Sequence, residues 1–131
     1  MELIEWDNTL YSVQIEEFDN HHKKIVNLIN KLHKAMLKGE GKQVLGAIFL
    51  ELKNYTQYHF NAEEQKMIGA NYPDFAKHKN EHKELLLQLS KHIQDYEWNK
   101  REVTIDTLRF LKEWLFNHIQ ISDKKYSSFL K

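Results

Sequence analysis

The sequence predicts an all-α protein, an up-down-up-down antiparallel four-helix bundle with an N-terminal arm and a short C-terminal helical tail. Apolar residues recur at steps of three and four along four segments of roughly 20 residues, which is the period of a helix with one buried face. The connections between these segments are short, and no segment shows the alternating pattern of a β-strand. At 131 residues, we expect one domain spanning residues 1–131.

Composition excludes several functional classes. The 19 basic and 19 acidic residues cancel, which argues against binding to nucleic acid or to a membrane surface. The chain has no cysteine, so disulfide-linked partners, thiolate metal sites and cysteine nucleophiles are excluded. The N-terminus is acidic and lacks the basic and apolar regions of a signal peptide. We therefore expect a soluble, cytoplasmic protein, and a monomer.

An arm and a first long helix open the chain. Residues 1–18 mix polar and aromatic side chains, and we expect them to lie over the bundle as an ordered arm. Asp19 is a candidate N-cap for the helix that follows, because its carboxylate can accept hydrogen bonds from free backbone N–H groups. The glycines of residues 39–41 end this helix. Its apolar face comprises His22, Ile25, Ile29, Leu32 and Met36.

Three further helices follow at similar lengths. Gly69 and Pro73 bracket the turn after the second helix, the third fades near residues 95–99, and Thr104 is a candidate N-cap for the fourth. The face of the second helix comprises Leu45, Ile48, Leu52, Tyr55, His59 and Glu63. That of the third comprises Phe75, His78, His82, Leu85, Leu89 and Ile93, and that of the fourth Leu108, Leu111, Leu115 and His118.

Histidines continue these apolar faces and therefore point inward. His59 and Glu63 are four residues apart, as are His78 and His82, so each pair can direct two groups to one point. In an antiparallel bundle, the start of the first and third helices and the end of the second and fourth lie at one end of the molecule. His22, His59, His78, His82 and His118 thus share one level, which predicts a site for a transition metal.

Other polar residues have simpler interpretations. His33 and His92 lie far from the common level and are expected to be ordinary packing residues. His21 points about 100° away from His22, so it is exposed or in contact with a ligand from outside. Glu64 should face solvent. Asp123 lies off the inward face of an unbroken helix and can reach the site only if the helix distorts or ends near residues 121–122.

Two alternative metal sites do not fit. Residues 78–82 match the H-x-x-E-H pattern of a zinc protease, but such short patterns recur by chance and the site holds too many histidines for one catalytic zinc. The chain contains no Glu-x-x-His motif, which argues against a ferritin-type carboxylate centre.

The motifs together resemble the hemerythrin family, and in particular the single-domain bacteriohemerythrins. The resemblance begins at Trp6 and at residues 12–15, Ser-Val-Gln-Ile, and covers nearly the whole chain. It continues through residues 18–24, Phe-Asp-Asn-His-His-Lys-Lys, residues 59–64, His-Phe-Asn-Ala-Glu-Glu, and then Met67, Tyr72-Pro73 and the His78 and His82 pair. It closes with Trp114, Leu115, His118, Ile119, Asp123, Lys124 and Tyr126. His21 departs from it, since many relatives carry glutamine there.

The resemblance implies a non-haem di-iron centre with an oxo or hydroxo bridge between the two iron ions. His78, His82 and His118 would bind one iron, His22 and His59 the other, and Glu63 and Asp123 would bridge both. The second iron would then keep one coordination position open for dioxygen. Family positions place an apolar dioxygen pocket around it, formed by Ile25, Phe60, Trp114, Leu115 and Ile119. Tyr126 is a candidate hydrogen-bond donor to the ligands.

The function implied is reversible dioxygen binding by a protein that is not an enzyme, as an oxygen carrier, store or supplier. Imidazole ligands and an apolar pocket both favour binding of dioxygen over its cleavage. An oxygen-consuming enzyme could be the partner that receives the oxygen. Two alternatives stay open: an oxygen sensor acting through a partner, and a di-iron scavenger of nitric oxide or peroxide.

Overall fold

The computed structural model describes residues 4–39, 42–98 and 105–130, and within them it confirms the all-α four-helix bundle. The chain forms a short helix α1 (Asn8–Tyr11), then the long helices α2 (Glu16–Leu37), α3 (Lys42–Gly69) and α4 (Phe75–Trp98). The fourth long helix is built from α5 (Ile105–Asn117), the π-helix η1 (His118–Asp123) and α6 (Lys124–Leu130). Across the described residues, no helix is both long and apolar enough to cross a membrane.

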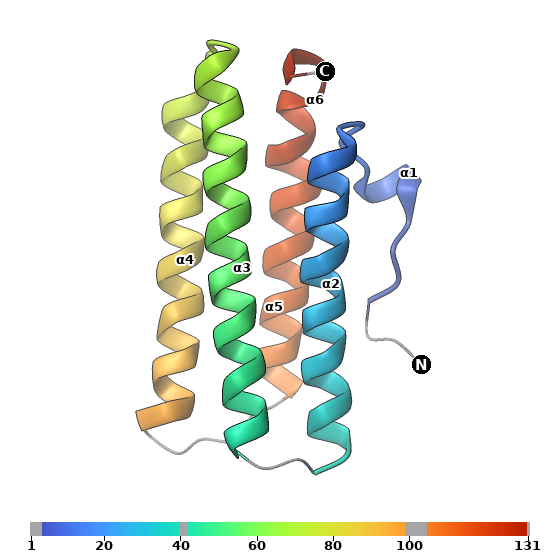
Figure 1. The fold of residues 1–131 in the computed structure, drawn as a ribbon, viewed down its shortest axis with the longest axis vertical. Helices are drawn as coiled ribbons and strands as arrows, with labels where there is room; N and C mark the ends of the chain where they lie inside the picture. Colours follow the sequence, from blue (N-terminus) through green and yellow to red (C-terminus); the bar gives the residue numbers. More distant parts are fainter. Residues whose placement is uncertain (1–3, 40–41, 99–104, 131) are drawn as a thin grey trace.

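The four long helices lie side by side with alternating direction (Figure 1). α2 packs on α3, α3 packs on α4, and α5 closes the bundle by contacting both α2 and α4. The beginnings of α2 and α4, the end of α3 and the C-terminal α6 lie at one end of the bundle, at the top of Figure 1. This arrangement confirms the up-down-up-down order that short connections predicted.

Asp19 does not cap α2, which corrects the sequence-based interpretation. The helix begins at Glu16, and its N-cap Ile15 makes no side-chain capping hydrogen bond. The Asp19 carboxylate lies in the first turn, where it accepts hydrogen bonds from the Val13 backbone N–H at 2.8 Å and from the Ser12 hydroxyl at 2.6 Å. Asp19 therefore fastens the N-terminal arm to α2.

Turn residues end α2 and α3 where the sequence indicated. After α2, Gly39 has a φ of +69°, a left-handed conformation that glycine adopts without steric cost. α3 ends at Gly69, and Asn71 takes a φ of +54° in the turn before Pro73. The predicted N-cap Thr104 lies outside the described residues.

Two apolar clusters enclose one polar layer. The larger cluster fills the middle of the bundle and includes Ile25, Phe60 and Leu115. The smaller cluster lies near the end where the helices α3 and α4 are connected, and it includes Phe18, Met67 and Tyr126. Along each helix, the inward-pointing histidines fall between a residue of one cluster and a residue of the other, so apolar side chains bound the polar layer on both sides.

Candidate metal centre

All seven side chains that the sequence singled out as metal ligands come together in this layer. They are His22 on α2, His59 and Glu63 on α3, His78 and His82 on α4, and His118 and Asp123 at the two ends of η1. None of the seven is more than 7% exposed. Every long helix of the bundle therefore contributes to one buried polar cluster.

The first group of potential ligand atoms comes from five of these residues. His82 Nε2 lies 3.2 Å from Glu63 Oε1 and 3.1 Å from His118 Nε2. Asp123 Oδ1 lies 3.0 Å from His118 Nε2 and 3.1 Å from His78 Nε2. One atom from each of the five lies within 4.8 Å of all the others, which is close enough to surround one metal ion.

A second group shares two residues with the first. His22 Nε2 lies 3.0 Å from Asp123 Oδ2 and 3.8 Å from Glu63 Oε2, while His59 Nε2 lies 3.3 Å from Glu63 Oε1. One potential ligand atom from each of these four residues, His22, His59, Glu63 and Asp123, likewise lies within 4.8 Å of the other three. Two carboxylates therefore stand between a group with three histidines and a group with two, an arrangement in which each carboxylate can bridge two metals.

The polar atoms of the cluster fit a metal and little else. Buried atoms that make no hydrogen bond of good geometry include both ring nitrogens of His22, Nε2 of His59 and His78, and both carboxylate oxygens of Asp123, which lie at close ion-pair distances from the histidines instead. A buried polar atom left without a well-formed hydrogen bond costs roughly 1–3 kcal/mol. Coordination to a cation removes that cost. Imidazole and carboxylate donors without thiolate suit a non-haem iron.

Protonation equilibria show how strongly the buried groups interact in the metal-free protein. Burial lowers the pKa of His59 to about 4. Burial also opposes the charged form of His118, but the negative charge of Asp123 and hydrogen bonds to Asp123 and Glu81 raise the pKa of His118 to about 10. Burial likewise opposes ionisation of Asp123, yet the charge on His118 and hydrogen bonds from neighbouring histidines hold its pKa well below the usual value.

The π-helix brings Asp123 to the site. An α-helix rotates about 100° per residue, so Asp123 would point away from His118 five positions earlier. In η1 the backbone hydrogen bonds span five residues instead of four, which returns the fifth residue to the same face. The distortion that sequence analysis required near residues 121–122 is therefore present, and π-helical turns of this kind are frequent at functional sites.

Further side chains hold the histidines from behind. The ring N–H of His82 at Nδ1 donates to Glu64 Oε2 at 2.8 Å, so the expectation that Glu64 faces solvent is wrong. His21 is buried, and its Nδ1 lies 2.8 Å from Nδ1 of His59. It therefore contacts a candidate metal ligand without belonging to the ligand set, which was one of its two expected positions. Contacts of this type fix the ring orientation and the tautomer of a metal-binding histidine.

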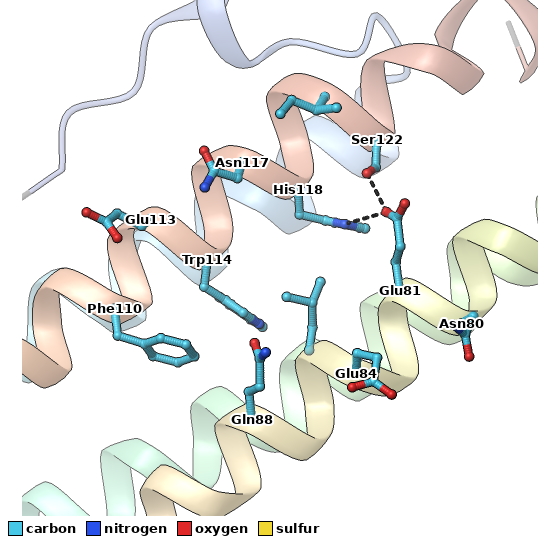
Figure 2. Close-up of a pocket in the computed structure, with 12 residues that line it drawn as sticks. Asn80, Glu81, Glu84, Gln88, Phe110, Glu113, Trp114, Asn117, His118 and Ser122 are labelled. Atoms are coloured by element: carbon cyan, nitrogen blue, oxygen red, sulfur yellow. Dashed lines mark hydrogen bonds and ion pairs between the residues drawn. The ribbon is translucent and has the colours of Figure 1, made fainter.

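Two more contacts complete this outer layer. The Tyr126 hydroxyl donates a hydrogen bond to Glu63, as expected for a donor to the ligands. Glu81, which sequence analysis left without a role, accepts a hydrogen bond from the Ser122 hydroxyl and lies 3.7 Å from Nδ1 of His118 (Figure 2). Its place in the H-x-x-E-H pattern of residues 78–82, directly before His82, was a signal in the sequence. Glu81 thus connects α4 to η1.

The other two inward histidines stay apart from the cluster. His33 is half-buried in the lower half of α2, and the ring of His92 stacks on Phe110 with a centroid distance of 4.1 Å. Neither belongs to a group of potential metal ligands among the described residues. Both agree with the expectation of ordinary packing residues.

A small cavity adjoins the two-histidine group. It offers about 10 Å³ to the centre of a water-sized molecule, which is near the lower limit of the space that one water molecule needs. Its wall includes the five residues expected to form the apolar pocket, Ile25, Phe60, Trp114, Leu115 and Ile119, together with His22, His59, His118 and Asp123. Leu85 also lines the cavity and was not predicted; its place one turn after His82 could have indicated it.

Comparison with known proteins places this site in a family. Residues 13–130 match the family model "Hemerythrin HHE cation binding domain". The chain is 34% identical to a bacteriohemerythrin of Methylococcus capsulatus over 126 residues, which is 96% of this chain and 95% of the relative. It is 31% identical to a hemerythrin-like protein of Naegleria gruberi, covering 95% and 92% of the two chains. A solved structure of wild-type hemerythrin superimposes with a TM-score of 0.91 at 34% identity, with 98% of each chain covered.

Proposed function

Because this chain belongs to the hemerythrin family, as its sequence motifs indicated, we propose that it binds dioxygen reversibly at a non-haem di-iron centre. Hemerythrins bind dioxygen, and the buried histidine and carboxylate cluster is suited to hold metal. In this proposal His78, His82 and His118 would hold one iron, His22 and His59 would hold the other, and Glu63 and Asp123 would be ligands to both. The two irons would also share an oxo or hydroxo bridge.

The observation that carries the proposal is the small cavity beside His22 and His59. Their group contains one histidine fewer than the other, so it would supply one ligand fewer to a metal ion, and the cavity lies beside this group. When bound, a pair of ferrous ions supplies an open position and the two electrons that dioxygen binding requires. The chain itself supplies a small space with a largely apolar wall beside that position.

The lining of the cavity favours binding over turnover. Apart from the proposed metal ligands, it consists of Leu85, Trp114 and four other aliphatic or aromatic side chains, none of which is an acid or a base. Proton delivery that would promote cleavage or release of bound oxygen therefore has no obvious donor on this side. The same apolar wall disfavours water and charge separation. These features support a carrier, store or supplier rather than an enzyme.

Spectroscopy tests the proposal directly. We expect two irons per chain by elemental analysis of protein produced in iron-replete cells. The reduced protein should gain a charge-transfer spectrum on exposure to air and lose it under vacuum, over several cycles. One zinc per chain, or irreversible oxidation in the first cycle, would rule out reversible binding. Sustained consumption of nitric oxide or peroxide by the reduced protein would instead identify a scavenger.

A further inference from the structure

A second, much larger cavity lies directly outside the first. It is a groove of about 490 Å³ between α4 and the fourth long helix, lined by residues from Asn80 to Gln88 and from Phe110 to Ser122 (Figure 2). Leu85, Trp114 and His118 line both the groove and the small inner cavity. These three side chains therefore form the partition between the exterior and the proposed dioxygen site.

Trp114 is the fixed part of this partition. Its side chain projects from α5 into the groove toward the side of Gln88 (Figure 2), and only 6% of the residue is exposed. The ring packs near Phe60, with a centroid distance of 6.4 Å, and a buried indole rearranges with difficulty in a close-packed interior. Its Nε1 is buried and has no hydrogen-bond partner among the described residues, so it offers a polar contact on the path inward.

Leu85 is the movable part. It is half-buried at the edge of the larger apolar cluster, and it carries no polar atom that would tie it to a neighbour. A rotamer change of one partly exposed side chain displaces far fewer atoms than the shift of a helix, which takes microseconds to milliseconds. His118, the third shared residue, is held by Asp123 and Glu81 and cannot move without disturbing the metal centre. Rotation of Leu85 is therefore the change that connects the two cavities at the lowest cost.

Acidic side chains line much of the groove. Among the described residues, the lining contains Glu81, Glu84 and Glu113 and no lysine or arginine, and His118, which lies 3.7 Å from Glu81, is the lining residue that can carry positive charge. A passage lined by negative charge lowers the local concentration of anions and leaves a neutral molecule unaffected. The effect falls with ionic strength, because exposed charges are screened over about 10 Å at 0.1 M salt.

We propose that this groove is the entrance through which dioxygen reaches the inner cavity, that Leu85 is the side chain that moves aside, and that the groove carboxylates discriminate against small anions. The proposal rests on the proposed function, since it concerns access to the same site. In this proposal Leu85 controls the rate of dioxygen entry, and Glu84 and Glu113 control selectivity against anions. None of the three binds metal.

The first test changes the size of the passage. Leu85→Ala in the iron-loaded protein should raise the association and dissociation rates of dioxygen several-fold and by a similar factor, so that the affinity stays nearly constant. Leu85→Phe should lower both rates. Leu87→Ala is the matched control, because Leu87 is 57% exposed on the same helix and lines neither cavity. Unchanged rates in folded, iron-loaded Leu85 variants would overturn the proposal.

The second test changes the charge. The double variant Glu84→Gln, Glu113→Gln removes two exposed carboxylates that touch no proposed ligand. Azide association with the oxidised protein should accelerate by up to about tenfold at low salt, and the difference should shrink as salt is added. The association rate of dioxygen should not change. An azide rate that stays the same at low salt would show that anions do not enter through this groove.

Xenon provides a measurement that does not depend on iron chemistry. Apolar cavities bind xenon, so crystals of Leu85→Ala under xenon pressure should show a xenon atom in the space between the groove and the inner cavity. The two proposals can fail separately. If the protein does not bind dioxygen reversibly, but Leu85→Ala shows xenon at this position and faster azide association, the proposed function is wrong and the proposed entrance is supported. A variant with xenon only at other sites would refute the entrance.

Discussion

Asp123 lies five residues after His118, yet its Oδ1 is 3.0 Å from the Nε2 of that histidine. On an α-helix these two side chains would diverge, and the π-helix between them makes the contact possible. The same contact places one oxygen of Asp123 with the three-histidine group and the other, 3.0 Å from His22 Nε2, with the two-histidine group. Local helix geometry thus decides whether a second carboxylate reaches both groups of potential ligands.

Asp123→Ala should therefore lose the paired centre. We expect the variant to bind less than two irons per chain and to lack the spectrum of a bridged di-ferric pair, because Glu63 is then the only described carboxylate left that reaches both groups. The melting temperature of the iron-loaded protein should also fall, since metal binding is coupled to folding. Asp123→Asn, which keeps the size of the side chain, should fail similarly. Two irons with normal oxygen binding in either variant would show that Asp123 is not a ligand.

Glu64→Ala should weaken iron binding although Glu64 lies outside the proposed ligand set. Its carboxylate holds the Nδ1–H of His82, and removal of such a partner typically costs about 10- to 100-fold in metal affinity. Glu64→Gln keeps an acceptor oxygen and should recover part of the loss. Competition with an iron chelator measures the affinity. Glu51→Ala, on the exposed face of the same helix, is the control and should leave the affinity unchanged.

Leu115→Ala should still bind two irons and become oxygenated, but the oxygenated protein should decay faster to the oxidised form. The substitution removes part of the apolar cavity wall and admits water, at a stability cost of roughly 2–5 kcal/mol for a buried leucine. Stopped-flow mixing with oxygen, followed by the decay of the spectrum, measures the effect. Leu111→Ala is a matched control, since Leu111 is fully buried but does not line the cavity. Equal decay in the two variants would remove Leu115 from the pocket.

The metal-free protein should lose stability as the pH rises from 6.5 toward 10. The pKa of His118 is raised from 6.5 to about 10 on folding, so the folded state binds more protons than the unfolded state in this window. The contribution is complete below pH 6.5 and vanishes as the pH passes 10. Denaturant melts of the iron-free protein across this range, compared with His118→Gln, measure it. A variant with the same pH dependence as the parent would contradict the assignment.

The sequence predicted the bundle and the level of the histidines because both depend only on the period of the helix. His22, His59, His78, His82 and His118 follow their own apolar faces, and antiparallel order brings them together. Asp123 could not be placed in this way. The residue types at positions 118–123 do not indicate that the backbone hydrogen bonds change there from the α-helical to the π-helical pattern. Its expected role came from the family resemblance alone.

The sequence-based prediction also missed contacts between separate segments of the chain. Glu64 was expected in solvent because it adjoins an inward residue, but its side chain is long enough to reach around α3 to His82. Asp19 was expected to cap a helix that in fact starts three residues earlier, at Glu16. Both errors arise from treating each helix alone, whereas the partner of the carboxylate is another part of the chain.

The ligands proposed for one metal centre span the chain from His22 on α2 to Asp123 at the end of η1, and every long helix supplies at least one. In polymer terms the centre acts as a cross-link that closes several loops at once, and closure of long loops removes conformational entropy from the unfolded chain much as a disulfide does. This chain has no cysteine to provide such a link. Complete unfolding of the loaded protein therefore requires release of the metal, which makes its resistance to proteolysis a direct measure of metal occupancy.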